Sequence, residues 1–84
     1  MLVRYKWVMA GPGPSEAVIL VDTLAGPEEV IVDMTILKEG SVDVGEAITR
    51  RNEAFLVELP REASSGRMRA WVHEDNIIKD SIAA

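Results

Sequence analysis

Hydrophobic and polar positions alternate most clearly in the second half of the chain. Phe55, Val57 and Leu59 alternate with Leu56 and Glu58. A period of two is typical of a strand with one buried face. Pro60 follows and has no backbone N–H to give to a sheet, so the strand is expected to end there.

A second strand is predicted over residues 67–72, after the small, turn-forming residues 63–66. Gly66 is suited to this turn because glycine adopts positive φ without steric cost. The two faces of the returning strand differ in composition: one carries Met68, Ala70 and Val72, and the other Arg67, Arg69 and Trp71. Residues 54–72 therefore predict a hairpin whose faces are distinct.

The hairpin runs into a polar segment, residues 73–76, whose length suits a single 3₁₀ turn. Ile77 and Ile78 then resume an extended apolar pair. This order, with Trp71 and Val72 before the turn, resembles the carboxy-terminal half of an SH3-like small barrel. The resemblance covers about 24 of 84 residues and implies a strongly bent, partly open barrel. That family's acidic and aromatic ligand positions have no counterpart here, so binding of proline-rich peptides is not implied.

Extended patterns also fill the first half of the chain. An alternating segment at residues 3–9 predicts a first strand, which the glycine- and proline-rich residues 11–15 end. The nearly continuous β-branched run at 17–23 predicts a central strand covered on both faces. Alternation over residues 30–37 predicts a third strand, and residues 38–40 break it. The expected fold is one all-β domain over residues 1–84, a meander of five to seven strands.

Residues 41–53 allow two interpretations. Val42 and Val44 fit an extended segment, with a second short strand beginning at Ile48. A helix capped by Asp43 is the alternative, but Gly45 would destabilise it by roughly 1 kcal/mol relative to alanine. We favour strand and turn. The last four residues, 81–84, are expected to fray.

Composition narrows the class of protein. Hydrophobic residues make up 48% of the chain, which argues against disorder. No apolar run approaches the roughly 20 residues that span a bilayer, and the amino terminus lacks the pattern of a signal peptide. A cytoplasmic protein without a membrane segment is therefore expected. With no cysteine, disulfides and thiolate chemistry are excluded.

No residue pattern points to catalysis. His73 is the only histidine, and its neighbours Glu74 and Asp75 are consecutive in sequence, so the three side chains are not expected to converge on a metal ion. No serine lies in a GxSxG motif, and no phosphate-binding glycine spacing is present. We expect no enzyme activity, no metal and no cofactor.

The charges are unevenly distributed. The net charge is −5, and residues 1–47 carry three cations against eight anions. Residues 48–84 are neutral overall, yet five arginines lie between positions 50 and 69. Solvated loops and strand ends explain such charges most simply; an acidic partner is the functional alternative. The candidate partner-binding residues are Arg50, Arg51, Arg61, Arg67, Arg69 and Trp71.

Within this set, Arg67 and Arg69 are two positions apart and are expected on one face, with Arg61 near the same end of the hairpin. Glu58 and Glu62 are the carboxylates expected to neutralise them if the cluster has no binding role. Most of the four aromatic residues should be buried in so small a core. For Trp71 we favour the core over the surface; on the surface it would form a stacking patch with its neighbouring arginines.

These observations favour a non-catalytic module or accessory subunit that binds another protein. A small nucleic-acid-binding barrel using the same arginines and Trp71 is the alternative, opposed by the net negative charge. A small enzyme ranks third.

Overall fold

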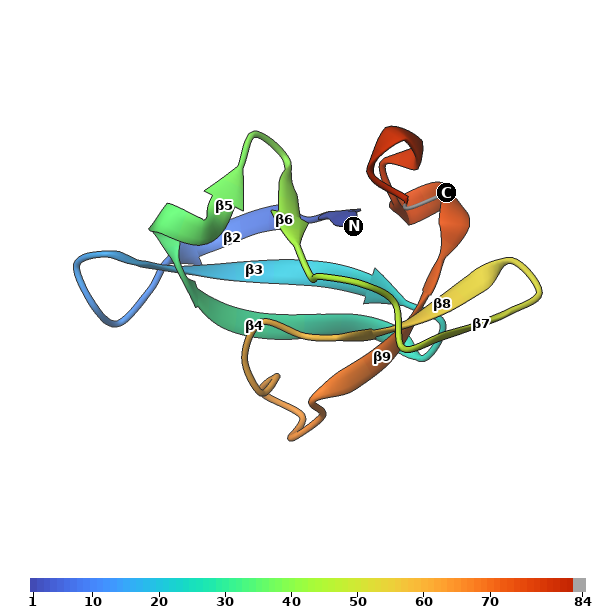
Figure 1. The fold of residues 1–84 in the computed structure, drawn as a ribbon. Coiled ribbons are helices and arrows are strands. Elements are labelled where there is room, and N and C mark those ends of the chain that lie inside the picture. Colours follow the sequence, from blue (N-terminus) through green and yellow to red (C-terminus); the bar gives the residue numbers. More distant parts are fainter. Residues whose placement is uncertain (83–84) are drawn as a thin grey trace.

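The computed structural model describes residues 1–82, which form short strands and single 3₁₀ turns (Figure 1). Within this range no helix exceeds three residues, so the expected all-β class is confirmed. The strands are β1 (Leu2–Arg4), β2 (Lys6–Ala10), β3 (Glu16–Thr23), β4 (Gly26–Asp33), β5 (Leu37–Lys38), β6 (Ser41–Asp43), β7 (Thr49–Arg51), β8 (Ala54–Glu58) and β9 (Arg69–His73). The 3₁₀ turns are η1 (Met34–Ile36), η2 (Glu74–Asn76) and η3 (Lys79–Ser81).

The strands form three antiparallel sheets of three strands each. Two are meanders, with the orders β2-β3-β4 and β7-β8-β9, and the third has the order β1-β6-β5. β3 and β4 pair along their whole length, from Glu16 opposite Asp33 to Thr23 opposite Gly26. As the β-branched run predicts, β3 is the central strand of its sheet, and four of its eight residues are buried.

The inner faces of all three sheets share one hydrophobic core. Its largest fully buried side chains include Ile19 of β3, Val57 of β8 and Ile77, which follows η2. Contacts between distant segments hold the sheets together; among them, Val3 bridges to Ile77, and the Leu24 N–H donates to the Trp71 carbonyl at 2.9 Å. The strands of residues 1–82 do not close into a barrel and outnumber the five to seven expected, so those two expectations are not confirmed.

The first expected strand, residues 3–9, is divided at Tyr5 because its two halves join different sheets. β1 pairs with β6, whereas β2 pairs with β3 and carries a bulge between Trp7 and Met9. β2 is an edge strand, and every one of its residues is exposed. Trp7 is 52% exposed and Tyr5 is only partly buried, so the expectation that most aromatic residues are buried is wrong, although Phe55 lies in the core.

The third strand ends four residues earlier than expected. The Asp33 carboxylate accepts a hydrogen bond from the Thr35 N–H at 2.9 Å and caps η1. Met34 and Ile36 then lie in this turn with their side chains exposed. Their apparent alternation therefore does not mark a buried face.

Residues 41–53 adopt the strand and turn that we favour. β6 ends at Asp43, Gly45 follows with a φ of +74°, and β7 begins at Thr49. A positive φ interrupts a right-handed helix, so the helical alternative is wrong.

The hairpin of β8 and β9 confirms the predicted faces. Phe55 lies opposite Val72 and Val57 opposite Ala70, and all four are buried. Met68 lies before β9 and is exposed, so the buried face begins later than predicted.

Beyond the hairpin, η2 occupies the predicted turn. The expectation of a frayed tail is wrong for Ser81, whose hydroxyl accepts a hydrogen bond from the Leu2 N–H at 2.7 Å. Ile82 also packs partly buried against the core. Residues 83–84 lie outside the described residues.

Candidate binding surface

The outer face of the β7-β8-β9 sheet carries the main cluster of candidate residues. Because Phe55, Val57, Ala70 and Val72 point into the core, the residues between them point outward. The register places Leu56 opposite Trp71 on this outer face. This outer face therefore combines apolar and cationic side chains from neighbouring strands.

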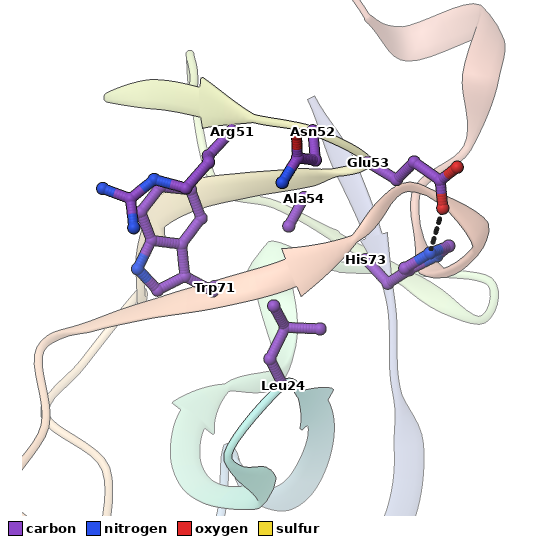
Figure 2. A pocket seen from close by; sticks show the side chains of 7 residues that line it. All are labelled: Leu24, Arg51, Asn52, Glu53, Ala54, Trp71 and His73. Carbon is purple, nitrogen blue, oxygen red and sulfur yellow. Dashed lines mark hydrogen bonds and ion pairs between the residues drawn. The ribbon is translucent and has the colours of Figure 1, made fainter.

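A hollow of about 310 Å³ lies on one side of Trp71 (Figure 2). Figure 2 shows the Arg51 side chain beside the indole and Leu24 reaching in from the turn between β3 and β4. The Arg51 guanidinium carbon is 5.1 Å from the ring centroid, a distance typical of a cation–π contact. The lining residues are Leu24, Arg51, Asn52, Glu53, Ala54, Trp71 and His73.

A second hollow, of about 410 Å³, also borders Trp71. Leu24 and Trp71 line both hollows, so the two hollows adjoin at this apolar pair, which we call the apolar ridge. The second hollow brings Arg67 and Arg69 to the same place as Leu56. We call the following residues together the Trp71 surface: Leu24, Arg51, Leu56, Arg67, Arg69 and Trp71.

Two of the predicted arginines lie elsewhere and are neutralised. The Arg61 Nη1 is 2.6 Å from the Glu16 Oε2, and the Arg50 Nη2 is 3.0 Å from the Glu74 Oε2. Arg50 also lies over the Phe55 ring, on the opposite side of the strand from Arg51. Arg50 and Arg51 are adjacent in β7 and therefore lie on opposite faces of the sheet.

The three arginines of the Trp71 surface have no such partner. Within residues 1–82, no carboxylate lies within ion-pair distance of Arg51, Arg67 or Arg69. Glu58 is opposite Arg69 in the register, but in this part of the chain neither it nor Glu62 forms an ion pair. The surface therefore keeps three unneutralised cations around an apolar ridge.

The position of Trp71 corrects the sequence prediction. Trp71 is half-buried, lines both hollows and is not part of the core cluster, so the favoured core location is wrong. Leu24 was missed by sequence reasoning. Its sequence position could have indicated a binding role, because Leu24 is a large apolar residue at the tip of a tight hairpin. It is 61% exposed there.

His73 lies at the rim of the first hollow with a fixed set of neighbours. The Asp75 N–H donates to its Nδ1 at 3.1 Å, and its Nε2 lies 3.2 Å from the Glu53 Oε2 (Figure 2). Its Nδ1 also lies 3.4 Å from the Asp75 Oδ2, so the ring lies between two carboxylates. Across residues 1–82, no group of three histidine or carboxylate side chains is arranged to hold a metal ion.

Comparison with protein-family models, curated proteins and solved structures finds no match to this chain. In the described part of the chain, no helix has the length and apolar character needed to cross a bilayer.

Proposed function

We propose that this protein is a non-catalytic interaction module, or an accessory subunit, that binds an acidic segment of another protein on the Trp71 surface. One observation carries the proposal. Arg51, Arg67 and Arg69 surround an apolar ridge and lack carboxylate partners within residues 1–82, in a chain whose net charge is −5.

The composition of the surface supports protein binding. Interfaces typically have an apolar centre and a polar rim, and tryptophan and arginine carry a disproportionate share of binding energy. Leu24, Leu56 and Trp71 supply the centre here, and the arginines form the rim. Unpaired arginines favour a carboxylate-bearing partner because the guanidinium binds carboxylates through paired hydrogen bonds.

Nucleic acid remains the second candidate because Trp71 and its arginines offer a stacking platform with positive charge. Two features favour protein instead. Arg51 already lies over the indole ring on which a base would stack. The overall negative charge also opposes a polyanion as long as a nucleic acid strand.

The proposal extends to the fold and the location. We propose that the three sheets correspond to a partly open SH3-like barrel; the order of hairpin, η2 and Ile77 and the contact of Leu24 with Trp71 support this. We also propose a cytoplasmic protein, which is compatible with the composition.

Short synthetic peptides test the function. Fluorescence anisotropy would compare peptides of alternating glutamate and valine with peptides of alternating lysine and valine. The acidic peptides should bind more tightly, and Arg67→Glu combined with Arg69→Glu should weaken that binding by at least about tenfold, or 1.4 kcal/mol. The loss should shrink as salt rises.

A matched control is Lys38→Glu combined with Lys79→Glu, which changes the net charge equally but lies outside the Trp71 surface. This control should bind acidic peptide nearly as well as the wild type. Equal binding of acidic and basic peptides, or equal losses in the two double variants, would contradict the proposal. Tighter binding of a single-stranded oligothymidylate would favour the nucleic-acid alternative.

A further inference from the structure

The main chain of β9 has an edge that is only partly occupied. β9 is the last strand of its sheet and pairs with β8 on one side. The Leu59 N–H donates to the Met68 carbonyl at 2.8 Å, which makes this a hydrogen-bonded pair of the ladder. In an antiparallel ladder such pairs recur every second residue. The peptide groups of Ala70 and Val72 therefore point toward β8. The peptide groups of Arg69 and Trp71 point toward the opposite edge of β9.

A contact between β9 and the hairpin of β3 and β4 agrees with this direction of the Trp71 peptide group. The Leu24 N–H reaches the Trp71 carbonyl from the side opposite β8. In the part of the chain that the structure describes, this is the only hydrogen bond from another segment to the main chain of Arg69 or Trp71 on that edge. The N–H and carbonyl of Arg69 and the N–H of Trp71 are thus left without a protein partner there.

The second hollow borders this part of β9 and extends over the outer face to Leu56. Its lining combines residues of the turn between β3 and β4 with residues of the β8-β9 hairpin: Thr23, Leu24, Ala25, Leu56, Arg67, Arg69, Ala70 and Trp71. A volume of about 410 Å³ accommodates a few residues of an extended chain, and the hollow is open to solvent. Main-chain groups, two cationic side chains and an apolar wall therefore meet in one place.

We propose that the acidic partner segment binds here as an added strand, hydrogen-bonded to the free edge of β9. This inference rests on the proposed function and specifies how the ligand is held. Main-chain hydrogen bonds supply affinity in this mode of recognition, and every second side chain supplies specificity. Acidic residues two positions apart in the added strand lie on one face, which matches the presence of Arg67 and Arg69 in one hollow.

The exposed edge of β2 is a poorer match. A bulge between Trp7 and Met9 interrupts its regular pairing, and bulges protect edges from added strands. Lys6 is its cation, and the ammonium group lies 3.8 Å from the Asp22 carboxylate. Of these two edges, the one at β9 therefore has the charge complementarity that selects an acidic segment.

Selective N-methylation of the probe peptide tests this geometry. The glutamate–valine peptide would be prepared in two further forms, methylated on the backbone nitrogens of either the glutamates or the valines. In an added strand, the backbone N–H groups of only one residue type, either the glutamates or the valines, point toward β9. One form should lose binding by at least about tenfold, and the other should bind within about threefold of the parent peptide.

Amide hydrogen exchange supplies an independent readout. Saturation with the parent peptide should slow exchange of the Arg69 and Trp71 amides by about tenfold or more, and leave the Lys6 and Val8 amides of β2 unchanged. Protection of the β2 amides instead would overturn the inference, as would self-association of the protein through β9 in place of peptide binding.

The outcomes separate the two proposals. Acidic peptide that binds with equal affinity in both methylated forms overturns the added strand and leaves the proposed function standing. Acidic peptide that binds no better than the lysine–valine peptide overturns both.

Discussion

The guanidinium carbon of Arg51 lies 5.1 Å from the centre of the Trp71 ring, joining strands β7 and β9 across the outer face of their sheet. The contact covers part of an indole that would otherwise be more exposed. It also places a cation beside the first hollow. The same pair therefore contributes to both the stability of the hairpin and the charge of the candidate surface.

Removing the charge of Arg51 tests this contact. Arg51→Met keeps much of the side-chain length and should lower the free energy of unfolding by about 0.5–1 kcal/mol, the range for exposed cation–π pairs. Denaturant unfolding would measure the loss. Arg67→Met is the matched control, because no cation–π contact of Arg67 is present in residues 1–82. A loss of stability as large in the control would contradict the role of the stack.

Truncating the buried face of β8 should destabilise the whole domain. Phe55 is 5% exposed, and Phe55→Ala should cost about 3–5 kcal/mol because it removes buried surface and leaves a cavity. Val57→Ala should cost less because it removes fewer atoms. Ile48→Ala, at a position that is 45% exposed, should change stability by only about 0.5 kcal/mol. Thermal melts of the three variants should rank in this order.

Substitution of Gly45 should change the free energy of unfolding in opposite directions for the extended and the helical interpretation of this segment. At a φ of +74°, a side chain is strained, so Gly45→Ala should destabilise the protein by about 1–2 kcal/mol. The open space around the residue means that this loss reflects backbone strain rather than a clash. If residues 43–53 formed a helix instead, the same substitution would stabilise the protein by about 1 kcal/mol. Urea unfolding distinguishes the two outcomes.

Asp43 should make stability depend on pH on the acid side. Hydrogen bonds from the Gly45 N–H and from the Met1 amino group lower the pKa of Asp43 below its ordinary value. A folded-state pKa below the unfolded value means that this contribution is present above the unfolded pKa and is lost as the pH falls through the folded pKa. The carboxylate is largely exposed, so the contribution should stay below about 1 kcal/mol.

Asp43→Asn should therefore melt below the wild type at neutral pH, and the difference should narrow as the pH falls below the unfolded pKa. The asparagine side chain keeps an oxygen that accepts from the Gly45 N–H, so Asp43→Ala should lose more stability than Asp43→Asn. A difference between wild type and Asp43→Asn that stays constant across the acid range would contradict the assignment.

Substitutions of Arg61 and Arg67 should affect peptide binding differently, although both belong to the group of five arginines between positions 50 and 69. Arg61 is paired with Glu16, and a double-mutant cycle of Arg61→Met with Glu16→Gln should give a coupling of about 0.2–1 kcal/mol that weakens with salt. Arg61→Met should leave binding of the acidic peptide unchanged, whereas Arg67→Met should weaken it. Equal effects on binding would show that charge alone, and not position, governs the interaction.

Local periodicity determined much of the secondary structure. The alternation of Phe55, Val57 and Leu59 predicted a buried strand face because a strand directs successive side chains to opposite sides. The turn at η2 and the break at Gly45 also followed from short segments. These features depend on residues that are neighbours in sequence, so the sequence by itself carried the necessary information.

Tertiary structure decided which of the arginines share a surface. Arg61 pairs with Glu16, which is 45 positions away, and the Trp71 surface is completed by Leu24 from a distant hairpin. The exposure of Trp7 likewise follows from β2 being an edge strand, which depends on the arrangement of the sheets. Such contacts join residues far apart in the chain, and no local pattern specifies them, because the same alternating strand can lie at the centre or at the edge of a sheet.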